Sequence, residues 1–282
     1  MKKSISIWSF YGDWSLKEKM KLAKDAGFEG FELDVSGDGP ITLGSSDAEI
    51  DQIGELAAES GLTLSGLATG MYWEFNPASE NAETRASAKT VLEKQIRVAS
   101  RLGIDAVLVV PGSVGADFIL GCEELSYDLV WDRATAFVAD SLPLAKELGV
   151  TMCIENVWNK FLLSPREMGQ FIDQFNDERV GSYFDVGNVL ATGYPEHWIS
   201  ILGDRIRRVH VKDYRRAVGS VDGFVDLLSG DVNWPAVVQS LKASGYDGWV
   251  AAEMIPPVPF YKHAPETLIY NTSRAMDSIF AL

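Results

Sequence analysis

The sequence predicts a closed (β/α)8 barrel, a TIM barrel of the α/β class, with a single domain over residues 1–282. Apolar, β-rich runs alternate with helical patterns along the chain, which favours a parallel sheet covered by helices. Eight such runs favour closure of the sheet into a barrel over an open sheet. No linker rich in proline, glycine or serine divides the chain, and 282 residues can bury a core of this size.

Eight short runs have the composition of buried strands. They are expected at residues 5–8, 30–35, 63–68, 106–110, 151–155, 181–185, 208–212 and 248–253. Apolar residues predominate in them, as strands covered on both faces require. Helical segments separate the runs, and a further helix at 265–281 follows the last one. Neither a G-x-G-x-x-G loop nor a Walker-type loop follows the first run, so an open nucleotide-binding sheet is the less favoured alternative.

The helix boundaries carry local signals of their own. A glycine lies between each of five helical patterns and the β-rich run that follows it, at Gly27, Gly61, Gly103, Gly149 and Gly245. Glycine just past a helix end readily adopts the left-handed conformation that terminates the helix. Serine three residues before glutamate, the pattern of a capping box, marks helix starts at Ser15, Ser46 and Ser164.

Composition and charge limit the class of partner. A formal net charge of -15 makes nucleic acid or an anionic membrane surface an unsuitable partner, because both attract a basic face. Cys122 and Cys153 form no disulfide or zinc-binding pattern, which fits a reducing cytoplasm. The apolar run near the N-terminus is short and interrupted by serines, so it is interpreted as a strand rather than a signal peptide. No run approaches the roughly 18 apolar residues of a membrane span.

Four polar side chains lie where successive predicted strands end. The runs TMCIE, YFD, RRVHV and WVAAE place Glu155, Asp185, His210 and Glu253 at the end of a barrel that usually carries the chemistry. Taken singly, a carboxylate there could cap the next helix, and a histidine could be hydrogen-bonded in the core. Together, at four consecutive strands, they favour one shared site. Three oxygen donors and one imidazole nitrogen suit Mn²⁺, Mg²⁺, Co²⁺ or Zn²⁺.

The segments IENVWN, FDVGNV, HVKDYRR and AAE resemble the sugar phosphate isomerase/epimerase family, the xylose isomerase-like barrels. Within it the chain is most similar to the ketose 3-epimerases. The resemblance runs over essentially the whole chain, with its specific matches between Glu155 and Glu253. It implies that Glu155, Asp185, His210 and Glu253 bind one divalent metal ion, with Mn²⁺ expected before Mg²⁺, Co²⁺ or Zn²⁺. It also implies a metal-dependent epimerase or isomerase that acts on a ketose or ketose phosphate.

Epimerisation at C3 requires a proton to leave the carbon next to the carbonyl and another to return to the opposite face. A metal ion would stabilise the enediolate, and two carboxylates would act as base and acid. We assign these roles to Glu155 and Glu253, which are also expected ligands, because their strands flank the other two. Asp185 and His210 are then ligands only.

Five further residues are expected to contact the sugar. Arg216 lies six residues after His210, the spacing at which the family places a substrate-binding arginine. Asn188 stands where family members often have a histidine. Lys212 belongs to a basic cluster that could hold a phosphate, and Trp8 and Trp158 could cover the apolar faces of the sugar. The simpler alternatives are solvated loop charges for the basic cluster, Lys212, Arg215 and Arg216, and ordinary packing for the tryptophans.

Two other functions are compatible with the same residues. A sugar or inosose dehydratase would share the proton abstraction but expel a neighbouring hydroxyl group. A sugar-binding barrel without catalysis would keep the glutamates only as ligands. A related DNA-repair endonuclease is disfavoured, because it would need several metal ions held by many histidines and the chain has three. The exposed-looking aromatic loops would suit a homodimer.

Overall fold

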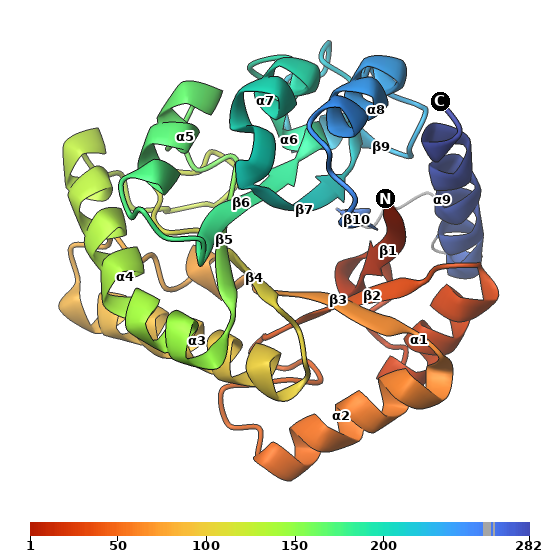
Figure 1. Ribbon diagram of the computed structural model, residues 1–282, viewed down its shortest axis with the longest axis horizontal. Helices are drawn as coiled ribbons and strands as arrows, with labels where there is room; N and C mark the ends of the chain where they lie inside the picture. The colour runs from red at the N-terminus through yellow and green to blue at the C-terminus, as the bar shows by residue number, and fades with distance from the viewer. Residues whose placement is uncertain (256–260, 262) are drawn as a thin grey trace. The chain divides into compact units, whose positions relative to one another are not determined.

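A computed structural model describes residues 1–255, 261 and 263–282. Eight parallel strands close into a barrel in the order β1-β10-β7-β6-β5-β4-β3-β2, and helices lie between successive strands along the chain (Figure 1). This confirms the predicted (β/α)8 barrel. The domain boundary at residues 1–282 stays a prediction.

The barrel strands and helices have the following bounds. The strands are β1 Lys2–Ser6, β2 Gly30–Asp34, β3 Thr63–Ala68, β4 Ala106–Val109, β5 Thr151–Glu155, β6 Val180–Asp185, β7 Ile206–Val211 and β10 Trp249–Ala252. The helices are α1 Leu16–Asp25, α2 Asp47–Ser60, α3 Ala82–Arg101, α4 Tyr127–Leu148, α5 Pro165–Asp173, α6 Val186–Val189, α7 Pro195–Leu202, α8 Trp234–Ala243 and α9 Pro265–Phe280. A two-stranded antiparallel hairpin, β8 Asp213–Tyr214 and β9 Phe224–Val225, follows β7.

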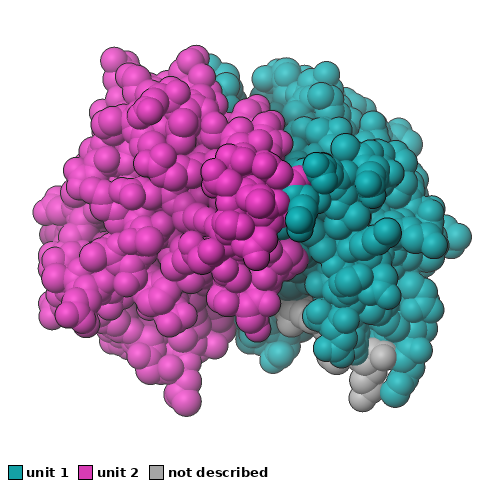
Figure 2. All heavy atoms as spheres, turned by 90° about the horizontal axis from the view of Figure 1, so that it is seen from below, with its two compact units in different colours: residues 1–33, 52–65, 184–282 teal, residues 34–51, 66–183 magenta. Residues whose placement is uncertain are grey.

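The chain forms two compact units (Figure 2). The first contains residues 1–33, 52–65 and 184–282, and the second contains residues 34–51 and 66–183. In the first unit β1 pairs with both β2 and β10, and β10 pairs with β7. In the second unit β4 pairs with both β3 and β5, and β5 pairs with β6.

The first strand lies earlier than predicted. It was expected at residues 5–8, but β1 spans Lys2–Ser6, and Ile7–Ser9 form a 3-10 turn. The Ser6 side chain accepts a hydrogen bond from the Trp8 N–H and so caps this turn. Because this local hydrogen bond competes with strand pairing, the apolar Ile7 and Trp8 do not extend the strand.

The predicted helix boundaries are confirmed. Each of the five glycines has a positive φ, for example 70° at Gly149 and 92° at Gly27. The capping box at Ser15 forms in full, with Glu18 as its partner. At Ser164 only half of the box forms, because Glu167 accepts hydrogen bonds from the Tyr127 hydroxyl and from the Leu163 N–H instead.

Among the described residues, no helix combines the length and the apolar character that crossing a bilayer requires. The longest helix, α4, carries charged residues at intervals and a proline, Pro143, inside it.

The turn from β6 into α6 packs against the end of β7. An ideal Cβ at Gly187 would lie 2.6 Å from the Lys212 Cβ and 3.0 Å from the Lys212 carbonyl oxygen. Two of the atoms in the way belong to backbone, so a side chain at residue 187 would have to displace the chain around Lys212. Glycine is therefore needed here for close approach rather than for a special φ.

Gly187→Ala is expected to lower the free energy of unfolding by about 1–3 kcal/mol, the usual cost of overpacking. Urea denaturation measures this change. Gly70→Ala is the matched control, because nothing lies within 4 Å of its added Cβ. The control should change the unfolding free energy by less than about 0.5 kcal/mol, and an equal effect of the two substitutions would contradict the packing argument.

Candidate metal centre

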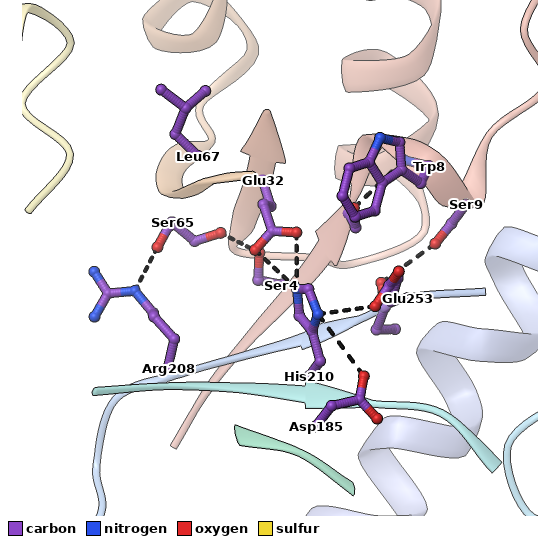
Figure 3. A network of polar contacts seen from close by, with 12 residues as sticks. Ser4, Trp8, Ser9, Glu32, Ser65, Leu67, Asp185, Arg208, His210 and Glu253 are labelled. Atoms are coloured by element: carbon purple, nitrogen blue, oxygen red, sulfur yellow. Dashed lines mark hydrogen bonds and ion pairs between the residues drawn. The ribbon is translucent and has the colours of Figure 1, made fainter. Parts of the chain in front are cut away.

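His210 lies at the centre of a polar network inside the first unit (Figure 3). It comes from β7, and its side chain is fully buried. Its Nδ1 lies 2.8 Å from Oε2 of Glu253 and 3.9 Å from Oδ2 of Asp185. Its Nε2 lies 2.9 and 3.0 Å from the two carboxylate oxygens of Glu32. One ring nitrogen therefore faces the predicted ligands, and the other faces a carboxylate that was not predicted.

Asp185 ends β6 and serves two purposes. Its Oδ1 accepts a hydrogen bond of 2.7 Å from the Asn188 N–H and so caps the short helix α6. Its Oδ2 lies 3.2 Å from the Nζ of Lys212. The sequence left two alternatives for Asp185, a helix cap or a member of a shared site. Oδ1 caps the helix, and Oδ2 faces the shared site.

Glu253 follows β10 directly and is held at both ends. Its backbone N–H donates to the Val211 carbonyl, and the Met254 N–H donates to the Ser9 hydroxyl. Its Oε2 is 2.9 Å from the Nζ of Lys212, and its side chain is only 3% exposed. These two hydrogen bonds fix the backbone of residues 253 and 254. The Glu253 carboxylate is thereby held within reach of His210.

The ammonium of Lys212 contacts the carboxylates of both Asp185 and Glu253. Its Nζ lies 3.2 Å from Oδ2 of Asp185 and 2.9 Å from Oε2 of Glu253. The ammonium also lies 5.3 Å from the ring centroid of Phe224 on β9. The side chain is nearly buried, so the alternative of a solvated loop charge is wrong for Lys212. Its contacts are to the acidic network itself.

The two carboxylates respond differently to their surroundings. Burial raises the pKa of Asp185, and although Lys212 opposes this rise, the nearby charge of Glu253 adds to it. Burial also raises the pKa of Glu253, but the charges of Lys212 and His210 outweigh burial and lower it to about 2. Without a further cation, Glu253 therefore stays ionised to a lower pH than Asp185 does.

Glu155 ends β5, as predicted, and is buried. One ligand atom from each of Glu155, Asp185, His210 and Glu253 lies within 4.8 Å of the others. Three carboxylates and one imidazole, all buried, need a positive charge beyond that of Lys212. The residues therefore fit one divalent ion, which would neutralise them and use one atom of each as a ligand.

Arg216 makes contacts that the sequence did not indicate. Its Nε donates to the Leu190 carbonyl and its Nη2 to the Gly193 carbonyl, both at 3.2 Å. Its guanidinium carbon lies 4.7 Å from the ring centroid of Tyr194. The arginine thus links the segment after β8 to the segment between α6 and α7, and its contact with substrate stays a prediction.

The other residues expected to contact substrate lie in varied settings. Asn188 is buried within α6, Trp8 is half-buried in the turn after β1, and Trp158 is half-buried after β5. Their roles in binding a sugar stay predictions.

Sequence reasoning missed Glu32 and Asp213. Glu32 is a charged residue within the apolar run GFELD, and this contrast was the available signal. Asp213 is fully buried and accepts hydrogen bonds from the backbone of Tyr214, Leu228 and Val232 and from the indole of Trp234. It therefore organises the long segment between β7 and α8.

Comparison with known proteins gives sequence relatives of several kinds. The chain is 24% identical over 186 residues to the uncharacterised protein MJ1311 of Methanocaldococcus jannaschii, covering 64% of this chain and 61% of that protein. It is 24% identical over 241 residues to L-ribulose-5-phosphate 3-epimerase UlaE of Salmonella paratyphi A, covering 84% and 81%. It is 26% identical over 134 residues to inosose dehydratase of Geobacillus thermodenitrificans, covering 41% and 44%.

Solved structures share the fold. D-psicose 3-epimerase from Clostridium cellulolyticum H10, solved with D-tagatose, superposes with a TM-score of 0.79 at 17% identity, covering 99% of this chain and 98% of that one. The IOLI protein, solved with a zinc atom, superposes with a TM-score of 0.82 at 16% identity, covering 100% and 98%. The family model described as "Xylose isomerase-like TIM barrel" matches residues 20–272. With nearly the whole barrel inside that match, the chain belongs to the xylose isomerase-like TIM barrel family.

Proposed function

We propose that this protein is a divalent-metal-dependent epimerase of a ketose or ketose phosphate. The observation that carries the proposal is the buried group of Glu155, Asp185, His210 and Glu253, whose ligand atoms lie close enough to share one ion. Epimerases of ketoses and ketose phosphates among the related proteins support it. Mn²⁺ is the proposed ion, and the cytoplasm is the proposed location.

The reaction needs one base and one acid on opposite faces of C3. In the proposal one of Glu155 and Glu253 removes the C3 proton. The electron pair of the broken C3–H bond moves toward the carbonyl group at C2. The other glutamate, protonated, then gives a proton to the opposite face of C3 as the carbonyl re-forms. A bound divalent ion would supply Lewis-acid stabilisation of the negative charge that develops on the substrate oxygens.

Lys212 supports Glu253 as a ligand. Its ammonium lies 2.9 Å from Oε2 and helps to keep the carboxylate ionised, which is the form that binds a metal ion. Asp185 and His210 act as ligands only. Arg216, Asn188, Lys212, Trp8 and Trp158 are proposed to contact the sugar, as predicted.

A dehydratase is the second candidate, because the chain matches inosose dehydratase over 134 residues. That reaction would use the same base but would eliminate a hydroxyl group from the neighbouring carbon. The product has lost water, so mass spectrometry separates it from an epimer.

Exchange of substrate protons in D₂O tests the main proposal. With Mn²⁺ and a panel of free ketoses and ketose phosphates, proton NMR should show deuterium at C3 and a second diastereomer of one of them. Glu155→Gln and Glu253→Gln should each slow exchange by at least about 10²-fold, since general acid–base catalysis contributes that much. Glu178→Gln, an exposed side chain, is the control.

Each other outcome of this experiment has a meaning. Deuterium at C1 would indicate aldose–ketose isomerisation, and loss of water would indicate a dehydratase. Exchange at the wild-type rate in both glutamine variants would refute the acid/base assignment. Absence of any exchange would favour a barrel that binds sugar without catalysis.

Removal of the metal gives a separate prediction. Dialysis against a chelator should reduce exchange to the background rate, and Mn²⁺ should restore it. Mn²⁺ at 100 times its Kd should also raise the free energy of unfolding by about 2.7 kcal/mol. Asp185→Asn should lose most of this stabilisation, whereas a variant that keeps it would show that the ion binds elsewhere.

The effect of Lys212 on Glu253 predicts how acid affects the metal-free protein. The folded pKa of Glu253, about 2, lies below its ordinary 4.5, so its ionisation stabilises the fold above pH 4.5. This contribution is lost as the pH falls from about 4.5 toward 2. Lys212→Met should raise the folded pKa, so the variant should lose less unfolding free energy between pH 5 and pH 3 than the wild type.

Urea denaturation of the metal-free proteins at several pH values measures this difference. Lys160→Met is the matched control, because Lys160 forms an exposed ion pair with Asp117. Its stability should follow the pH in parallel with the wild type. A parallel curve for Lys212→Met as well would mean that Lys212 does not lower the pKa of Glu253.

A further inference from the structure

Glu32 makes an unusual contact inside the first unit. It lies in the middle of β2, its side chain is fully buried, and its carboxylate reaches the Nε2 of His210 on β7. Both oxygens take part, at 2.9 and 3.0 Å (Figure 3). In the barrel, β1 and β10 lie between β2 and β7, so the contact crosses the barrel interior.

Small side chains on the two intervening strands leave room for this contact. Ser4 on β1 and Ala251 on β10 are partners in register, and Ala251 is also the partner of His210. Since side chains alternate along a strand, Ala251 lies on the same face as Glu253, which is the interior. Figure 3 shows Ser4 beneath Glu32, with its hydroxyl turned toward Ser65.

The contact decides which nitrogen of His210 carries the hydrogen. A carboxylate has only acceptors, so Nε2 is the donor in its bond with Glu32. In the neutral imidazole Nδ1 then has a lone pair, and Nδ1 is the atom near Glu253 and Asp185. This is the tautomer that a ligand bonding through Nδ1 requires.

We propose that Glu32 is a positioning residue that fixes the tautomer and the ring orientation of His210, so that Nδ1 can bind the metal ion. The inference rests on the metal centre of the proposed function and extends it to a residue that touches neither the ion nor the sugar. Carboxylate partners of this kind also make the histidine a stronger ligand.

Mn²⁺ affinity tests the inference independently of activity. Glu32→Gln keeps the size of the side chain, but its amide can either accept from Nε2 or donate to it. Competition with a chromophoric chelator should therefore show a Kd for Mn²⁺ about 10–100-fold higher than in the wild type. Asp213→Asn is the matched control, since Asp213 is equally buried but bonds to the segment before α8. This control should keep the wild-type Kd even where it lowers stability.

Nitrogen-15 NMR of the metal-free proteins gives a second measurement. Where the imidazole is neutral, wild-type His210 should show hydrogen on Nε2 only, whereas Glu32→Gln should show a mixture of both tautomers. His210→Asn identifies the signal among those of the three histidines. If Glu32→Gln does not fold, Glu32→Asp replaces it, because its carboxylate is one methylene shorter and should also weaken Mn²⁺ binding.

The outcomes separate the two proposals. A wild-type protein that does not bind Mn²⁺ would refute the metal centre itself. A wild-type protein that binds Mn²⁺, together with a Glu32 variant of unchanged Kd and unchanged tautomer, would refute only the role of Glu32. A raised Kd in Asp213→Asn equal to that in Glu32→Gln would show a general effect of losing a buried carboxylate, and would also overturn the inference.

Discussion

The concentration of buried carboxylates around one histidine is the constraint on which the rest of this site depends. Glu32, Asp185 and Glu253 all contact His210 or lie within 3.9 Å of it, in an interior where an unpaired charge costs several kcal/mol. The positive charge beside them is the ammonium of Lys212, 3.2 Å from Asp185 and 2.9 Å from Glu253. Because one ammonium does not balance the carboxylates, a divalent ion fits the chemistry of the group. Burial raises the pKa of Asp185, whereas at Glu253 the charges of Lys212 and His210 outweigh burial and lower the pKa.

The barrel supplies the geometry that makes this concentration reachable. Parallel strands end at one side of the sheet, so His210 becomes a neighbour of Asp185, 25 positions before it in the chain, and of Glu253, 43 positions after it. Local hydrogen bonds then fix two of them. The α6 N-terminus holds the Asp185 carboxylate, and the Ser9 hydroxyl holds the backbone after Glu253. Gly187 packs closely on the Cβ and backbone of Lys212, whose ammonium contacts both carboxylates. Secondary structure thus sets the positions, and short local bonds set the side-chain directions.

The sequence predicted the parts of this arrangement that arise locally. Helix ends at glycine and the polar residues at strand ends are signals contained within a few residues, and they were found. The first strand was misplaced because a hydrogen bond from the Trp8 N–H to the Ser6 side chain turned an apolar run into a 3-10 turn. The contact of Glu32 with His210 could not be predicted, since it joins residues 178 apart across the barrel, and periodicity states only that each side chain faces inward. The main-chain partners of Arg216 depend in the same way on loop conformation.

The acidic network and Arg216, which is proposed to bind the sugar, differ in burial. The acidic network is built on strands and on the residues that immediately follow them, and its side chains are almost completely buried. Arg216, by contrast, is exposed and belongs to a segment that is ordered by Asp213 and tied by its own guanidinium to the carbonyls of residues 190 and 193. In the proposed function, a change in these loops would alter which sugar is bound without disturbing the carboxylates. Identifying the sugar would then depend on the loops rather than on the strand-end residues.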